Sequence, residues 1–196
     1  MKKVVGITGG IASGKSTVCQ YLISLGYVVI DSDLISKDLS QKGKPIYKAL
    51  LETFGPTYFL TNLELDRKKL GRYIFENPLA REKLNAITHP LIVEEMKNLI
   101  KKTEENLIFL DIPLLFEAKL SYLCDTIVCV YVDKETQLKR LMDRDGISKE
   151  YALSKIASQM SLEEKKNKSN YVIESMESFE ETKENVRKIL NKLKGE

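Results

Sequence analysis

Residues near the N-terminus have the types and spacing needed to bind phosphate. Residues 9–17 read GGIASGKST, and Gly9 to Ser16 fits the pattern G-x-x-x-x-G-K-[ST]. In this pattern, backbone N–H groups and a helix N-terminus bind phosphate oxygens, the lysine reaches the β- and γ-phosphates, and the hydroxyl binds Mg²⁺. The last two roles fall on Lys15 and Ser16. The residues expected to bind nucleotide are Gly10, Ile11, Ala12, Ser13, Gly14, Lys15, Ser16 and Thr17.

The segments on either side of this loop are those that the motif requires. Residues 3–8 (KVVGIT) form a short apolar run typical of a buried strand. Val18, Tyr21, Leu22 and Leu25 recur at helical spacing, and Gly26 can end that helix. A strand, a glycine loop and a helix in this order predict a nucleotide-binding protein rather than a chance glycine-rich turn.

Two carboxylates follow the second apolar run, residues 27–31. If the chain stays extended there, Asp31 and Asp33 point to the same side, over the carboxyl end of the sheet. One could then accept a proton from a substrate hydroxyl and the other could hold Mg²⁺. We expect Asp33 to be the base and Asp31 to be the metal-linked residue; the competing interpretation is that Asp33 only caps the next helix.

A third carboxylate, Asp111, ends the apolar run at residues 107–111. A carboxylate in this position is the general form of a metal-linked acid in nucleotide-binding proteins of this type, although many strands end in Asp. Pro113 turns the chain after it. The apolar residues 114–116, among them Leu115, could line a substrate pocket or fill the core.

Arg140 and Arg144 are i, i+4 neighbours on an expected helix and therefore share a face. They could close over the phosphates and neutralise charge on the transferred group. Asp143 and Asp145 beside them leave open a solvated, ion-paired surface. His89, the only histidine, precedes a proline that could start a helix, so a role in packing or helix entry competes with substrate binding.

Short apolar runs alternating with helical patterns predict an α/β fold with a parallel sheet of about five strands, of the P-loop NTPase type, flanked by helices. Runs at residues 126–132 and 171–173 supply the remaining strands. Helices are expected near residues 46–54 and 65–75, and two more are expected to begin near residues 81 and 90. Others are expected at 135–144, at 148–160, from a capping box at 161–164, and at the C-terminus. We assign 1–36, 103–134 and 161–196 to the nucleotide-binding core, 37–102 to a helical substrate-binding insertion and 135–160 to a lid.

The composition is that of an ordinary globular protein. The 196 residues are 43% hydrophobic and 30% charged, with a net charge of +3. Residues 37–102 hold 13 Lys/Arg and 8 Asp/Glu, a net of +5, which leaves −2 elsewhere and suits an anionic substrate as well as a solvated surface. No stretch is long enough to span a membrane, and the short N-terminal apolar run lacks a convincing cleavage site. We therefore expect a cytoplasmic protein that binds neither nucleic acid nor membrane, with three reduced cysteines.

These motifs together resemble the dephospho-CoA kinase family over nearly the whole chain. The resemblance rests on the loop with the residues before it, on the D-x-D pair at 31–33, on His89-Pro90, on the run DIPLLFE at 111–117, on Arg140 and on IASQ at 156–159. It implies ATP-dependent phosphorylation of the ribose 3′-hydroxyl of dephospho-CoA, with ATP and Mg²⁺, by a monomer or weak homo-oligomer.

The resemblance also implies residue roles. Asp33 would be the base, and Lys15 and Arg140 would stabilise the transferred phosphoryl group. The CoA portion would bind the first insertion, with Arg144 on the nucleotide. The residues implied to contact the acceptor are Thr8, Asp31, Asp33, His89, Asp111, Pro113 and Leu115.

The chain departs from the family pattern at a few positions. Family members tend to have Gly where this chain has Ala12, and a methyl there is tolerable if the backbone is not left-handed. The usual Ala-Asp before the last strand is Ser169-Asn170, and Glu174-Ser175 replaces the usual Asn after it. These last changes concern the expected adenine contacts.

Two other functions compete with this one. A different small P-loop kinase could act on a nucleoside, nucleotide or shikimate-like hydroxyl. A nucleotide-dependent switch would need a guanine-reading N-K-x-D, and residues 167–170 (NKSN) fail at the last position. Residues 143–146 (DRDG) fit D-x-x-G but follow the wrong strand.

Overall fold

The computed structural model describes residues 2–195 and forms two compact units. One comprises Met1–Ile30 and Glu105–Glu196, and the other comprises Asp31–Glu104. We call them the sheet unit and the helical unit. The helical unit contains the 37–102 segment expected from the sequence and continues at both ends. At the N-terminal end, a helix already begins at Ser32.

A five-stranded sheet in the order β2-β3-β1-β4-β5 confirms the predicted fold class. The strands are β1 (Lys3–Gly9), β2 (Val28–Asp31), β3 (Leu107–Asp111), β4 (Thr126–Tyr131) and β5 (Tyr171–Glu174). β1 pairs in parallel with β3 on one side and with β4 on the other, and β4 pairs in parallel with β5. The phosphate-binding loop therefore leaves the central strand, and the register places Asp111 opposite Ile7, two residues before that strand ends.

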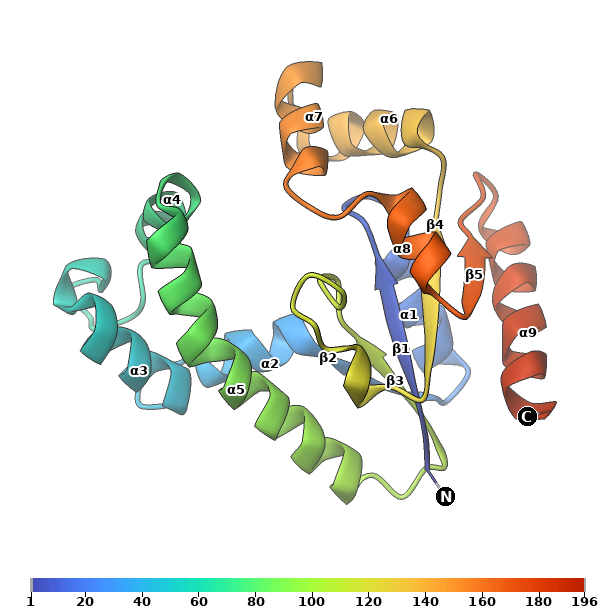
Figure 1. Ribbon diagram of the computed structural model, residues 1–196, viewed down its shortest axis with the longest axis horizontal. Coiled ribbons are helices and arrows are strands. Elements are labelled where there is room, and N and C mark those ends of the chain that lie inside the picture. The colour runs from blue at the N-terminus through green and yellow to red at the C-terminus, as the bar shows by residue number, and fades with distance from the viewer. Residues whose placement is uncertain (1, 196) are drawn as a thin grey trace. The chain divides into compact units, whose positions relative to one another are not determined.

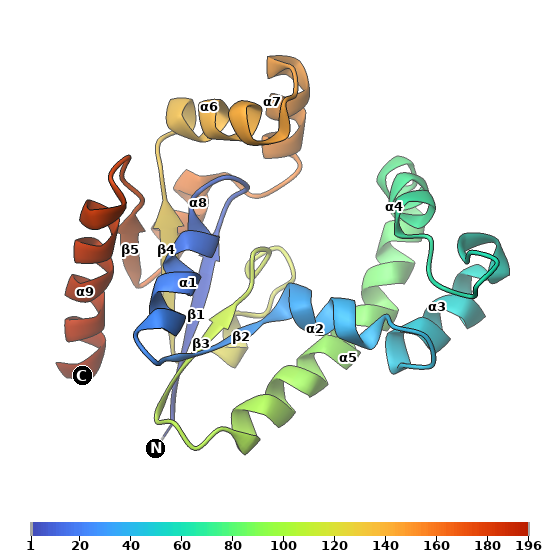
Figure 2. The same ribbon diagram turned by 180° about the vertical axis from the view of Figure 1, so that it is seen from behind.

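Helices cover both faces of this sheet (Figures 1 and 2). Side chains of β1 alternate, so Val5 and Ile7 face a core formed with α1 (Lys15–Ser24) and α9 (Phe179–Gly195). On the other face, α8 (Leu162–Lys168) packs Leu162 against Cys129 of β4. Apolar residues on both faces explain why the strands read as continuous apolar runs.

Two further helices, α6 (Lys134–Asp145) and α7 (Lys149–Ala157), lie beyond the carboxyl ends of β1 and β4 (Figure 1). Each of the three helices α6, α7 and α8 begins at a residue whose side chain accepts a backbone N–H bond, namely Asp133, Ser148 and Ser161. The capping box predicted at residues 161–164 is present. The sheet unit also contains a short 3₁₀ turn, Ser121–Leu123.

The helical unit consists of α2 (Ser32–Leu39), α3 (Pro45–Phe54), a 3₁₀ turn at Pro56–Tyr58, α4 (Arg67–Glu76) and α5 (Pro78–Lys102). α5 packs against α2, α3 and α4, and Met96 on α5 is fully buried. The prediction that separate helices begin near Arg81 and at His89-Pro90 is wrong, because α5 runs through Pro90.

The described helices and the three cysteines bear on membrane spans and disulfides. Within residues 2–195, the helices include none with the length and apolar character needed to cross a bilayer. Cys19, Cys124 and Cys129 are all free, and the first and last are buried, as the sequence predicted.

Candidate active site

The loop after β1 has the geometry of an anion-binding site. Gly14 immediately precedes α1 with φ of 90°, and the structure shows no side-chain hydrogen bond capping that helix. The N–H of Ser13 donates to the carbonyl of Gly10 over 3.1 Å, which curls the loop. Ser13 Oγ is buried and, among residues 2–195, has no hydrogen-bond partner. An uncapped helix N-terminus under a curled backbone suits phosphate oxygens, so the loop fits the nucleotide that its sequence predicts.

Ala12 does not meet the condition under which a methyl group would be tolerated without cost. Its φ is 59°, in the left-handed region. A Cβ in this region clashes with the backbone, typically at a cost of roughly 1–2 kcal/mol, which is why glycine is favoured there. The loop therefore holds a strained residue at its centre.

Gly14 is required by its surroundings as well as by its backbone angle. A Cβ on Gly14 would lie 2.3 Å from Ser175 Oγ, in the loop after β5. The same hypothetical atom would lie 3.7 Å from Arg140 Nη1. These distances bring Arg140, which the sequence predicted for the site, to the start of α1.

Arg140 is held on the loop after β5 by a set of hydrogen bonds. Its guanidinium donates to Ser175 Oγ over 2.9 Å, to the carbonyl of Ser175 over 3.2 Å and to the carbonyl of Met176 over 2.8 Å. Ser175, one of the two residues singled out after the last strand, therefore binds an arginine of α6. Sequence reasoning gave no sign of this contact.

Lys15 and Asp111 form an ion pair through Lys15 Nζ and Asp111 Oδ1, and both side chains are largely buried. Their meeting follows from the register of β1 and β3, which ends both strands at the same edge of the sheet. The structure thus brings together two of the predicted site residues from segments almost 100 positions apart.

Thr8 and the 111–117 segment are joined beside this ion pair. Thr8 is fully buried, and its hydroxyl donates to the carbonyl of Pro113 over 3.1 Å. Leu115 is also fully buried, and one of its methyl groups would lie 2.8 Å from a Cβ on Gly6. Leu115 therefore fills the core under β1, which is one of the two roles open for it from the sequence.

Arg144 does not join Arg140 at the loop. Its side chain is largely exposed and pairs with Asp145 over 2.8 Å, and Lys155 pairs with the same carboxylate over 2.8 Å. Hydrogen bonds from these two cations lower the pKa of Asp145 to about 2. Arg144 thus lies in the solvated ion-paired surface that the neighbouring aspartates indicated.

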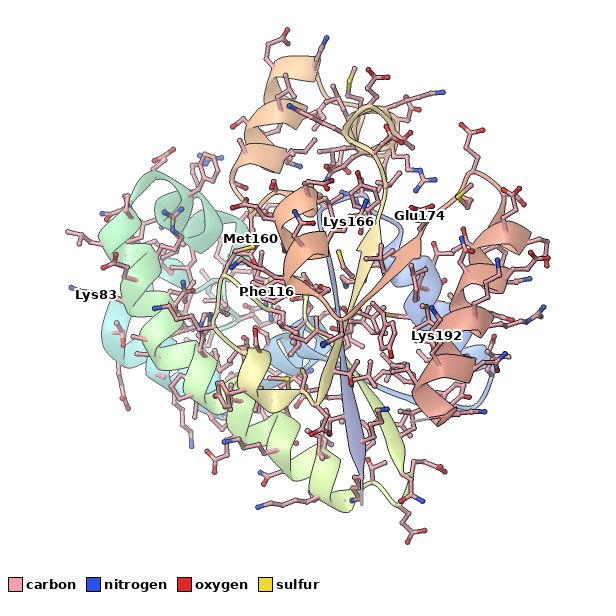
Figure 3. All side chains as sticks on the ribbon, turned by 45° about the vertical axis from the view of Figure 1, so that its right-hand side comes forward. Lys83, Phe116, Met160, Lys166, Glu174 and Lys192 are labelled. Carbon is pink, nitrogen blue, oxygen red and sulfur yellow. The ribbon has the colours of Figure 1, made fainter. Side chains whose placement is uncertain are left out.

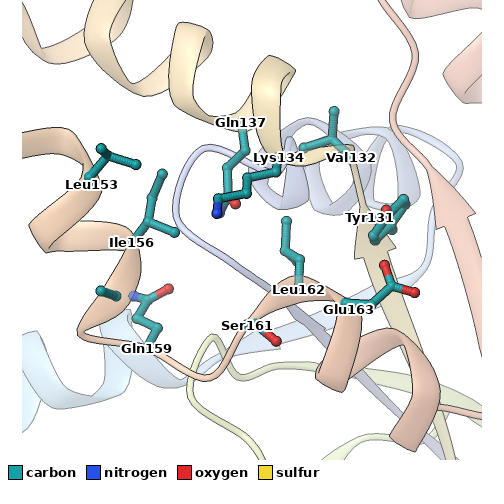
Figure 4. Close-up of a pocket in the computed structure, with 11 residues that line it drawn as sticks. Tyr131, Val132, Lys134, Gln137, Leu153, Ile156, Gln159, Ser161, Leu162 and Glu163 are labelled. Atoms are coloured by element: carbon teal, nitrogen blue, oxygen red, sulfur yellow. The ribbon is translucent and has the colours of Figure 1, made fainter. Parts of the chain in front are cut away.

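Two glutamines that sequence reasoning missed hold the loop from outside. Gln137 Nε2, on α6, donates to the carbonyl of Ile11 over 2.8 Å, and Gln159 Oε1, after α7, accepts from the N–H of Ile11 over 3.0 Å. Gln137 and Gln159 both line a cavity of about 380 Å³ between α6, α7, α8 and the end of β4 (Figure 4). Only the fold reveals that these side chains meet at the residue beside Ala12.

Lys165 and Glu117 are further residues whose role the sequence did not reveal. Lys165 lies in a lysine-rich stretch of α8 that reads as a solvated face, yet its side chain is completely buried. It pairs with Glu117 over 2.9 Å. Glu117 also accepts from the N–H of Met160 over 3.0 Å, where the 111–117 segment meets the residues after α7 (Phe116 and Met160 in Figure 3).

Asp31, Asp33 and His89 all lie in the helical unit, of which Asp31 is the first residue. The expectation of an extended chain through Asp31 and Asp33 is wrong, because α2 begins at Ser32. Asp31 Oδ1 caps this helix by accepting from the N–H groups of Asp33 (2.7 Å) and Leu34 (3.0 Å). Asp31 rather than Asp33 is therefore the helix cap, and Asp33 lies in the first turn.

His89 lies within α5 rather than at a helix start. Its side chain is half-buried, and this burial lowers the pKa of the imidazole below its ordinary value.

Comparisons with known proteins agree on one family. The model of the dephospho-CoA kinase family matches residues 3–181. A dephospho-CoA kinase from Carboxydothermus hydrogenoformans is 46% identical, with 97% of this chain and 94% of the relative covered. Two solved structures cover 98% of both chains. One is TT1252 from Thermus thermophilus (TM-score 0.85, 32% identity) and the other a dephospho-CoA kinase from Campylobacter jejuni (TM-score 0.71, 29% identity). A match of this extent to sequence and fold alike means that the chain belongs to the dephospho-CoA kinase family.

Proposed function

We propose that this protein transfers the γ-phosphoryl group of ATP to the ribose 3′-hydroxyl of dephospho-CoA, which gives coenzyme A and ADP. The observation that carries the proposal is the loop at residues 9–17, whose Lys15 pairs with Asp111, in a chain matched by the family model over residues 3–181. The reaction would take place in the cytoplasm, and the protein would act as a monomer or weak homo-oligomer.

Each group at the loop has a part in this transfer. Backbone N–H groups of residues 10–17 would bind the phosphates, and Lys15 would exchange part of its pairing with Asp111 for the β- and γ-phosphate oxygens. Arg140, already beside Gly14, would stabilise charge on the transferred group. These cationic groups are positioned in advance, so little reorganisation is needed during transfer.

Magnesium would neutralise the β- and γ-phosphate oxygens when the nucleotide is bound. Within residues 2–195 no cluster of three or more His, Cys, Asp or Glu side chains could hold a metal ion. Mg²⁺ usually keeps several waters and takes one or two protein ligands plus substrate phosphates. The Ser16 hydroxyl and, through water, Asp31 are proposed for these roles; Asp31 Oδ1 also caps α2.

The acceptor side of the reaction needs a base for the 3′-hydroxyl. Asp33 is proposed for this role. Asp31 caps α2, and Asp33 is the other carboxylate of the pair. Asp33 lies in the first turn of α2.

The proposal is tested by ATP turnover with and without dephospho-CoA, with the product examined for a 3′-phosphate. Nucleosides, nucleotides and shikimate serve as a panel of other acceptors. Turnover that requires dephospho-CoA and gives 3′-phosphorylated product is expected. Preference for another acceptor would make the protein a different small-molecule kinase, and GTP binding without transfer to any acceptor would make it a switch.

Replacement of Asp33 by Asn tests the base directly. General-base catalysis typically contributes 10²–10⁴-fold, so turnover should fall by about 100-fold or more while the melting temperature stays close to that of the wild type. Asp38→Asn on the same helix is the matched control, because Asp38 is exposed and pairs only with Lys44 among the ion pairs of the described residues. Near-normal turnover of Asp33→Asn would remove Asp33 from the mechanism.

A further inference from the structure

Lys165 is unusual because its side chain has no exposed surface. A buried ammonium group is costly unless hydrogen bonds and an opposite charge compensate for its lost hydration. Lys165 is on α8, the helix that packs on β4 and β1. The partners of Lys165 must therefore account for the burial of its charge.

The ammonium group makes two hydrogen bonds and one ion pair, with partners from two segments. Lys165 Nζ lies 2.7 Å from the carbonyl oxygen of Pro113, 2.9 Å from Glu117 Oε1 and 3.4 Å from the carbonyl oxygen of Gly9. Pro113 and Glu117 lie on the segment after β3, and Gly9 is the first residue of the phosphate-binding loop. The ammonium group of Lys165 thus contacts both the segment after β3 and the phosphate-binding loop.

Both segments carry residues of the proposed site close to these contacts. Pro113 is two residues after Asp111, which pairs with Lys15. The Pro113 carbonyl also accepts from Thr8, immediately before Gly9. Glu117 is fixed in turn by the N–H of Met160. The position of the Lys165 ammonium group therefore bears on where Asp111 and Pro113 lie relative to the loop.

We propose that Lys165 is a positioning residue, with Glu117 as its counter-ion, that sets the spacing between the phosphate-binding loop and the 111–117 segment. Because it is fully buried, it does not touch substrate. It acts through Pro113, Asp111 and Thr8, which the resemblance to the family implies as contacts of the acceptor. The inference thus rests on the proposed function for its kinetic consequence, but not for its structural one.

The competing explanation is an ion pair that serves stability alone. A charge-neutral replacement separates the two explanations. Lys165→Met leaves Glu117 without its ammonium partner and should lower the melting temperature. Adding Glu117→Met removes the second charge, and apolar replacement of a buried ion pair often restores stability.

The double variant should regain much of the melting temperature and still bind the acceptor poorly. We expect its KM for dephospho-CoA to rise about tenfold, the size expected for lost hydrogen bonds to a charged group, and its KM for ATP to change much less, because the bond to Gly9 is the longest of the three. Lys165→Arg, which keeps the charge, should recover part of the KM. Lys168→Met, an exposed lysine of the same helix, is the control and should leave both constants unchanged.

Hydrogen exchange gives a readout that does not need activity. The N–H groups of Ala118, Lys119 and Leu120 bond within this segment, and they should exchange faster in the double variant than in Lys168→Met, with the β4 amides unchanged. A double variant with wild-type KM values and wild-type exchange would overturn the proposal. If the wild-type protein does not phosphorylate dephospho-CoA, the proposed function fails, and the exchange rates alone decide the role of Lys165.

Discussion

At the scale of single residues, Ala12 shows how a local cost can be retained in a functional loop. Its φ of 59° lies in the left-handed region, which favours glycine. Strained residues persist where the surrounding structure fixes them, and Ile11 on one side is fixed by Gln137 and Gln159. The neighbouring contacts, rather than the residue itself, thus hold Ala12 in place.

Replacing Ala12 by Gly should therefore stabilise the protein. Removing the Cβ relieves the left-handed strain, and we expect a gain of about 1 kcal/mol in the free energy of unfolding, measured in urea. Ala49→Gly, in the interior of α3, is the matched control and should cost a similar amount because glycine is a poor helix former. Equal losses in both variants would mean that Ala12 bears no strain.

At the scale of elements, the loop depends on helices that do not carry the motif. α6 supplies Gln137 and the residues after α7 supply Gln159, so both bonds to Ile11 come from the segment predicted to be a lid. Movement of that segment would free the Ile11 backbone. The lid assignment stays a prediction, but its contacts couple the 135–160 segment to the shape of the phosphate site.

Replacement of Gln137 by Ala should weaken nucleotide binding. The partly buried carbonyl of Ile11 loses the hydrogen bond from this side chain, and a deficit of about 1–2 kcal/mol corresponds to a 5- to 30-fold increase in the dissociation constant for ATP. Isothermal titration calorimetry measures this directly. Lys139→Ala, an exposed residue of the same helix, should bind ATP as the wild type does; a matching loss there would point to α6 as a whole.

The sequence predicted the elements well where a single signal dominated. Apolar runs identified the strands, and Ser161 with Glu164 identified the start of α8. Prediction was wrong where two local signals competed. The sequence allowed an extended chain through Asp31 and Asp33 or a helix cap at Asp33, and the bonds from the N–H groups of Asp33 and Leu34 make Asp31 the cap.

Pro90 is the other case in which a local signal misled. Proline in a helix interior costs about 3 kcal/mol, so a helix start at His89-Pro90 was the better local interpretation. Contacts of α5 with three other helices outweigh that cost, and no local pattern reports them. The roles of Gln137 and Lys165 were hidden for the same reason: their partners are more than 40 positions away in the chain.

At the scale of the whole molecule, two thiols in the sheet unit link stability to pH. Burial raises the pKa of Cys129 to about 11, and burial with the nearby Asp125 carboxylate raises the pKa of Cys124 to about 12. The ordinary value is 9.0, so above that pH the unfolded chain loses protons that the folded protein keeps. Stability therefore falls as pH rises from about 9 toward 11, by up to about 1.4 kcal/mol per pH unit for each thiol.

A double variant with Cys124→Ala and Cys129→Ala should lack this part of the pH dependence. Urea unfolding at about pH 8 and again above pH 10 measures the loss in each protein, and the wild type should lose more than the variant. Other groups titrate in both proteins and cancel in the comparison. Equal losses would show that the two thiols ionise as readily in the fold as in the unfolded chain.

The central place of β1 has a consequence for how the chain assembles during synthesis. β1 is made first, yet its partners β3 and β4 begin at Leu107 and Thr126, about 100 residues later. The helices of Asp31–Glu104, which contact one another at shorter separations, emerge in between and can fold by local contacts. The phosphate-binding loop thus leaves the ribosome well before the strands that flank it and waits for its native neighbours.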